Sequence, residues 1–110
     1  MRVATAIYLR TATAPQETPD PALDGQEARC RAYAAAQGYG EPAVYVDIAT
    51  RAQLVALQAA TAQGEVHTII VDRPDRLSRD LQERRRLLQR FEHAGAHVHF
   101  VEGGLTSMLV

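Results

Sequence analysis

Arginines follow three separate apolar runs of the chain, each close to the point where the run ends. Arg10 follows the first run, Arg51 comes shortly after the second, and Arg76 and Arg79 follow the third. If these runs are parallel strands, their carboxyl ends meet at one edge of a sheet, where ligands usually bind. Guanidinium groups held close together repel one another, and a bound anion would remove that conflict. Because the planar fork of arginine matches a phosphate group, the pattern predicts a phosphate-binding edge.

Three aspartates in the same segment allow a different balance of charge. Asp72, Asp75 and Asp80 could neutralise the arginines internally, which would leave a solvated loop with surface salt bridges. A helix that begins near Asp80 would instead add backbone N–H groups and a positive dipole end for an anion. From the residue types alone, both interpretations stay open.

Strand and helix patterns alternate along the whole chain. Apolar runs rich in β-forming residues predict strands over Arg2–Leu9, Ala43–Asp47, Val66–Asp72 and residues 97–101. Helices are predicted from Pro21 to Gly38, from Thr50 to Gly64 and from about Asp80 to Ala94. This alternation predicts an α/β fold, a three-layer α/β/α sandwich with a mostly parallel sheet of about four to five strands. A length of 110 residues fits one domain, 1–110.

Capping residues mark the predicted helix starts. Asp20 and Thr50 are typical N-caps of the first two helices. Asp80 with Glu83 resembles a capping box, and Asp80 with Arg84 is a pair of opposite charges four residues apart. The apolar stripe of the last helix is expected to be Leu81, Leu88 and Phe91, with Leu87 and Ala94 beside it.

Composition and charge describe an ordinary globular domain. The chain is 46% hydrophobic and 23% charged, with a formal net charge of −1, so no overall basic field attracts nucleic acid. All of its basic residues are arginine, which indicates either a coding bias or selection for phosphate-binding forks. The single cysteine, Cys30, excludes an internal disulfide and is expected in the core. With no signal peptide or membrane span, the protein is expected to be cytoplasmic.

Metal and cofactor sites are not expected. His97 and His99 share one face of a strand, but no carboxylate or cysteine stands at ligand spacing, so a packed or partly exposed pair is predicted. No Gly-rich phosphate loop occurs. The arginines at positions 84–86 either touch DNA phosphate or form a solvated helix face.

Several motifs match one known family in order along the chain. Tyr8-Leu9-Arg10 is followed by "TAT", and Gln16 stands four residues beyond Ala12. This opening resembles that of the serine recombinases, the resolvases and invertases, which reads Tyr-x-Arg-Val-Ser-Thr-x-x-Gln. "QEARCRAYAAAQGY" is similar to the first helix of that family, and "IIVDRPDRLSRD" to its Asp-Arg-Leu-x-Arg signature. "FEHAGAHVHFVEGG" resembles its helix end and fourth strand. The resemblance spans nearly the whole chain.

The resemblance implies a DNA-cleaving and rejoining domain that forms a phosphoserine link to DNA. Carried over position by position, it implies these site residues: Arg10, Gln16, Arg51, Asp75, Arg76 and Arg79. The arginines would hold the scissile phosphate and offset the charge of its transition state. Asp75 would orient an arginine or assist proton transfer to the leaving sugar oxygen.

The position of the nucleophilic serine is Ala12. A methyl group cannot attack phosphorus, and loss of the attacking hydroxyl cost another enzyme about 10⁶-fold in rate. One interpretation is an inactive homologue with a surviving phosphate pocket. The alternative is a functional recombinase domain, either an engineered Ser→Ala variant or one that uses Thr11 or Thr13. Neighbouring side chains of an extended segment point to opposite sides, which disfavours both threonines.

Partners follow from the same resemblance. The family's catalytic domain continues into a long helix that forms the dimer interface, usually followed by a helix-turn-helix module for DNA binding. This chain ends at Val110, before such elements, so neither is expected here. The expected partners are DNA, through weak phosphate contacts, and a second copy or a full-length recombinase.

Overall fold

The computed structural model of the chain describes residues 4–11 and 21–102. Along these residues the elements are β1 (Thr5–Thr11), α1 (Pro21–Ala36), β2 (Ala43–Ile48), α2 (Ala52–Ala62), β3 (Thr68–Val71), α3 (Pro74–Leu77), α4 (Leu81–His93) and β4 (His97–Phe100). The predicted alternation is confirmed. The short helix α3 was not predicted; Pro74 stands at its start, where proline is well suited to a helix.

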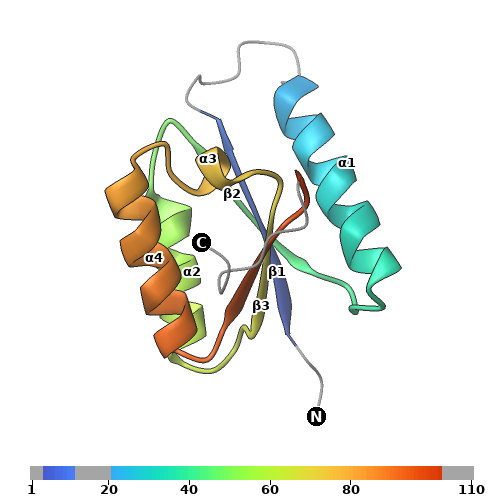
Figure 1. Cartoon of the computed structure of the whole chain (residues 1–110). Coiled ribbons are helices and arrows are strands. Elements are labelled where there is room, and N and C mark those ends of the chain that lie inside the picture. The colour runs from blue at the N-terminus through green and yellow to red at the C-terminus, as the bar shows by residue number, and fades with distance from the viewer. Residues whose placement is uncertain (1–3, 12–20, 103–110) are drawn as a thin grey trace.

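The four strands of the described residues form one parallel sheet in the order β2-β1-β3-β4. Helix α1 covers one face of this sheet, and α2 and α4 lie together on the other (Figure 1). The predicted three-layer α/β/α architecture is therefore confirmed. Helix α3 lies at the edge where β1 and β3 end, which is the edge predicted to carry the arginines (Figure 1).

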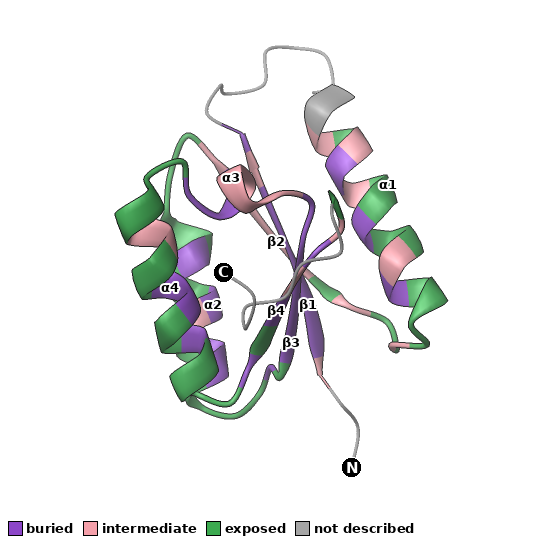
Figure 2. Ribbon diagram, in the orientation of Figure 1, coloured by how far each residue is buried: buried purple, intermediate pink, exposed green. Residues whose placement is uncertain are grey.

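β1 is the central strand and is buried on both faces (Figure 2). Its side chains alternate between two cores: Tyr8 packs with the α2 and α4 side, whereas Ile7 and Leu9 pack with the α1 side. Cys30 of α1 belongs to the second core, as predicted. Burial raises the pKa of the Cys30 thiol to about 12, so the thiol remains neutral and acts as a small apolar group.

α4 begins as predicted but its side chains pair differently. The Asp80 carboxylate caps the helix by accepting from the Gln82 and Glu83 N–H groups at 2.9 and 3.3 Å. Glu83 does not complete a capping box, because its carboxylate accepts the Ser78 hydroxyl at 2.6 Å. Arg84 donates to the Ser78 carbonyl and forms no ion pair with Asp80 among the described residues.

The apolar stripe of α4 is also narrower than predicted. Leu87, Leu88 and Phe91 are buried, whereas Leu81 is 45% exposed at the first turn. Ala94 lies beyond the last residue of α4 and is exposed. Within the part of the chain that the structure describes, no helix combines the length and apolarity that crossing a membrane requires.

α2 is capped by a residue from the preceding strand. The Asp47 carboxylate at the end of β2 accepts from the N–H groups of Gln53 and Leu54 at 2.8 and 3.0 Å. The predicted cap, Thr50, accepts only the Ala52 N–H, at 3.2 Å. Asp47 is fully buried, and its carboxylate also accepts a third hydrogen bond, from the Tyr8 hydroxyl at 2.6 Å. Burial and this carboxylate raise the pKa of Tyr8, so the phenol remains a donor. The predicted cap Asp20 lies outside the described residues.

Asp47→Ala should destabilise the domain by about 2–4 kcal/mol, because it removes the helix cap and leaves the buried Tyr8 hydroxyl without an acceptor. Thr50→Ala is the matched control and should cost less than about 1 kcal/mol. Urea unfolding monitored by circular dichroism measures both values. Equal losses would show that the Asp47 carboxylate is not the principal cap of α2.

Candidate functional site

The Arg10 side chain joins the end of β1 to α3. Its guanidinium group donates from Nε to the Arg76 carbonyl at 2.9 Å and from Nη2 to the Asp75 carbonyl at 2.6 Å. Arg76 makes a longer return contact, from Nη1 to the Arg10 carbonyl at 3.5 Å. Three of the residues that the sequence predicted for one site therefore lie in direct contact, although they are far apart in the chain.

The backbone of Arg10 is held by a side chain from α1. Pairing of β1 with β3 ends at Tyr8 and Val71, so the next backbone groups on that side of β1 need another partner. Gln26 supplies it: its amide oxygen accepts the Arg10 N–H at 3.3 Å, and its amide nitrogen donates to the Arg10 carbonyl at 3.0 Å. A primary amide offers both a donor and an acceptor, so Gln26 continues the ladder where β3 stops.

Sequence reasoning missed the role of Gln26. The residue is completely buried, and it lies on the same face of α1 as Leu23 and Cys30. A polar side chain at a position where the helix pattern requires an apolar one was the available signal, since a buried amide needs hydrogen-bond partners.

Arg51 reaches the neighbouring helix instead of α3. Its Nη2 lies 2.6 Å from a carboxylate oxygen of Glu83, and the same oxygen accepts the Ser78 hydroxyl. The Ser78 hydrogen bond and the positive charge of Arg51 lower the pKa of Glu83. This network ties the beginning of α2 to the beginning of α4, so Arg51 has an acid partner that the sequence did not predict.

The positive charges of the predicted residues act on one another. The pKa of Arg10 is lowered, first by burial and then by the charge of Arg51, with smaller contributions from Arg79 and Arg76. Arg79 is exposed and forms no ion pair within the described part of the chain. Two of the five N–H donors of Arg10 are used by the carbonyls of α3, which leaves others for a ligand. The charges of three other predicted arginines therefore reach Arg10.

The aspartates of this segment are occupied elsewhere. Asp72 accepts two hydrogen bonds from Arg29, at 2.7 and 2.8 Å. The Asp75 carboxylate lies 3.6 Å from Nε of Arg73, which is not one of the predicted site residues, whereas Arg10 contacts the Asp75 carbonyl. Among the described residues, neither these two aspartates nor Asp80 forms an ion pair with Arg10, Arg76 or Arg79.

At the α4 N-terminus, which was predicted to contribute to anion binding, a carboxylate of the chain itself competes for the backbone donors. The Asp80 carboxylate already accepts the first free N–H groups of α4. A carboxylate at that position satisfies the donors and offsets the positive dipole end, so little remains for a phosphate.

Two of the predicted site residues, Ala12 and Gln16, lie outside the described residues, as does Thr13. Thr11 is the last residue of β1 and is 7% exposed. Its carbonyl accepts the Ala49 N–H at 2.9 Å, which keeps the strand end paired with the segment after β2.

The histidines of β4 pack in the way the sequence indicated. His99 is half-buried, its Nδ1 lies 2.8 Å from the Tyr33 hydroxyl, and Tyr39 meets its ring edge-on. Burial lowers the pKa of His99, which favours the neutral imidazole. His97 is exposed. Within the described ranges, no three metal-ligating side chains gather at one point.

The comparison with protein families identifies the domain. The family described as Resolvase, N terminal domain matches residues 5–108. The chain belongs to this family. A search of curated proteins found no match.

Solved structures of resolvase-type domains have the same fold. The N-terminal catalytic domain of TP901-1 integrase is 23% identical, with a TM-score of 0.84 over 96% of this chain and 82% of that chain. A resolvase family site-specific recombinase from Streptococcus pneumoniae is 23% identical, with a TM-score of 0.86 over 97% and 77%. The C-terminal catalytic domain of ISC1926 TnpA, an IS607-like serine recombinase, is 25% identical, with a TM-score of 0.76 over 90% and 67%.

Gln26→Leu should release the end of β1 in this resolvase-type domain. The Arg10 N–H loses its only acceptor among the described residues, so its hydrogen exchange should accelerate at least tenfold, and stability should fall by about 1–3 kcal/mol. Gln37→Ala, at the exposed end of α1, is the control and should change neither value. If the Arg10 amide keeps its protection in Gln26→Leu, the amide clamp does not hold the strand end.

Proposed function

We propose that this domain is a degenerate serine-recombinase catalytic domain that binds a DNA phosphodiester without cleaving it. Membership of the resolvase family supplies the reaction class, and Ala12 at the nucleophile position removes the group that attacks phosphorus. The observation that supports a surviving phosphate site is the contact of the Arg10 guanidinium with the carbonyls of Asp75 and Arg76.

The arginines supply the chemistry of binding. Two carbonyls hold Arg10 rigidly, and Arg79 is exposed and has no acid partner among the residues that the structure describes, so their remaining N–H donors suit a phosphate oxygen. Arg76 adds a third charge. The charge of Arg51 lowers the pKa of Arg10, and Glu83 holds the Arg51 side chain. Gln16, as in the family motif, would stand near the vacant nucleophile position. Preorganised cations of this kind stabilise a developing phosphorane charge in an active relative.

A substitute nucleophile is disfavoured by the burial of Thr11. Its side chain belongs to the buried end of β1, so a phosphodiester would have to displace the strand end to reach it. Asp75 also contributes little to proton transfer in this proposal, since its carboxylate lies beside Arg73 and its carbonyl beside Arg10.

The role that fits these properties is regulatory or structural. The domain would make weak phosphate contacts with DNA in the cytoplasm, and would associate with a second copy or with a full-length recombinase. Because the formal net charge is only −1, affinity must come from the local cluster of arginines and not from a general basic field.

Incubation with a nicked suicide DNA substrate should give no covalent protein–DNA adduct. The same reaction with Ala12→Ser tests whether the serine alone restores attack, and denaturing gel electrophoresis followed by mass spectrometry measures the product. An adduct formed by the unaltered chain would overturn the proposal. Loss of that adduct in Thr11→Ala or Thr13→Ala would then identify the nucleophile.

Phosphate binding at the strand tips predicts a specific dependence on Arg79. Arg79→Ala should weaken binding of a fluorescent DNA duplex several-fold and reduce the slope of log affinity against log salt by about one. Arg85→Ala, an exposed arginine on α4, is the matched control and should leave both unchanged. If the two variants lose affinity equally, the contact is made by the basic face of α4 and not by the strand tips.

A further inference from the structure

A groove runs between α2 and α4, on the face of the domain opposite α1. Its wider part has a volume of about 620 Å³ and is lined by Ala62, Arg86, Gln89, Arg90, His93 and Ala94. A second hollow of about 310 Å³ shares Arg86 and Arg90 and continues towards Arg51. Because the two hollows share Arg86 and Arg90, they lie next to each other along the helix pair and are together called the groove.

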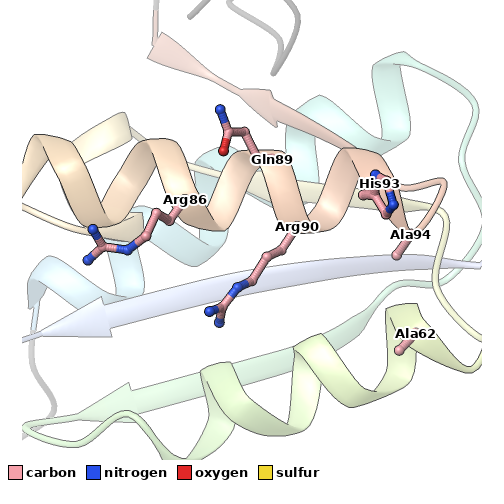
Figure 3. Close-up of a pocket in the computed structure, with 6 residues that line it drawn as sticks. All are labelled: Ala62, Arg86, Gln89, Arg90, His93 and Ala94. Atoms are coloured by element: carbon pink, nitrogen blue, oxygen red, sulfur yellow. The ribbon is translucent and has the colours of Figure 1, made fainter.

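Two arginines, Arg86 and Arg90, line this groove beside the small apolar side chains of Ala62 and Ala94. Figure 3 shows Arg86 and Arg90 leaving α4 on the side of α2, with Ala62 at the end of α2 and Ala94 beyond α4. Both arginines are exposed, and neither has an acid partner within the described part of the chain. They are four residues apart, so their side chains project from the same face of the helix.

An exposed apolar side chain lies farther along the same groove. Val55 of α2 is 62% exposed and lines the second hollow. The acid of that hollow, Glu83, is already engaged by Arg51 and Ser78, so it does not neutralise Arg86 or Arg90. The groove thus offers apolar contact and two positive charges that its lining acid, Glu83, does not neutralise.

We propose that this groove binds an acidic amphipathic helix of a partner protein. A third helix laid between two others buries an apolar stripe, which small residues such as Ala62 and Ala94 allow to approach closely. Two acids at i and i+4 of that helix have the same spacing as Arg86 and Arg90, so both pairs can form together. The proposal is independent of DNA binding at the strand tips.

A protein helix suits this groove better than a DNA backbone does. The wider part of the groove lies at the carboxyl-terminal end of α4, whereas the predicted phosphate site lies beyond its amino-terminal end. A helix of 13 residues spans about 20 Å, so one phosphate cannot serve both places. The described helices of the chain carry no two acids four residues apart, which argues against a second copy as the occupant.

The test uses a library of peptides of about 18 residues, long enough to form a helix. Glu is fixed at two positions four residues apart, and apolar residues vary on the same face. Control libraries carry Gln or Lys at the two fixed positions. Selected peptides should come from the Glu library and perturb the amide resonances of Ala62, Arg90 and Ala94 in NMR spectra of the whole chain.

Variants of the domain then test the two arginines. Affinity for the selected peptide should fall at least tenfold in the double variant Arg86→Glu, Arg90→Glu, and should recover for a twin peptide with Lys in place of Glu. Arg85→Glu, which does not line the groove, should bind normally. These variants are exposed surface changes, and circular dichroism checks their fold.

The proposal is overturned if no peptide of the Glu library binds tighter than the Gln controls, or if the double variant binds the selected peptide unchanged. It is also overturned if a DNA duplex binds this groove with the same dependence on Arg86 and Arg90. Concentration-dependent dimerisation abolished by the double variant would make a second copy the occupant instead.

Discussion

The bond between the Arg10 guanidinium and the main chain of α3 is the contact on which the candidate site depends. Arg10 is the last residue but one of the inner strand β1, and its guanidinium donates two hydrogen bonds to the carbonyls of Asp75 and Arg76 in α3, which follows β3. Carbonyls are uncharged acceptors, so they hold the guanidinium in place without cancelling its charge. A carboxylate in the same position would have fixed Arg10 equally well but would have left little attraction for a phosphate. These two hydrogen bonds therefore fix the Arg10 guanidinium and leave its positive charge uncancelled.

Three carboxylates of the described residues position helices. Asp47 caps α2 from the end of β2, Asp80 caps α4, and Glu83 joins the two helix starts through Arg51 and Ser78. Arg51 belongs both to this frame and to the residues predicted for the site, because Glu83 holds its side chain while its charge lowers the pKa of Arg10.

Much of the fold could be predicted from the sequence because its signals are local. Apolar runs, glycine stops and the Asp80 cap identified the alternating elements and the parallel sheet. The short helix α3, the Asp47 cap and the Gln26 clamp could not be predicted, because each depends on where a strand ends relative to a distant segment. Glu83 is an example. Its spacing to Asp80 suggests a capping box, but its carboxylate oxygen accepts hydrogen bonds from Ser78 and Arg51 instead. The site residues were proposed from their place at strand tips and from family resemblance; Arg10, Asp75 and Arg76 do meet, whereas their catalytic roles stay predictions.

The strand order has a consequence for how the chain comes to be folded during its synthesis. β1 is synthesised before the other described strands, yet it lies inside the sheet, where Ile7 pairs with Val44 on one side and Ile70 on the other. The two edges of β1, which is apolar on both faces, are therefore paired only after β2 and β3 have been synthesised. Such non-local pairing slows folding and leaves an aggregation-prone apolar strand exposed in the nascent chain. Chaperones that bind exposed apolar segments of a nascent chain would have their greatest effect on this domain before β3 has been synthesised.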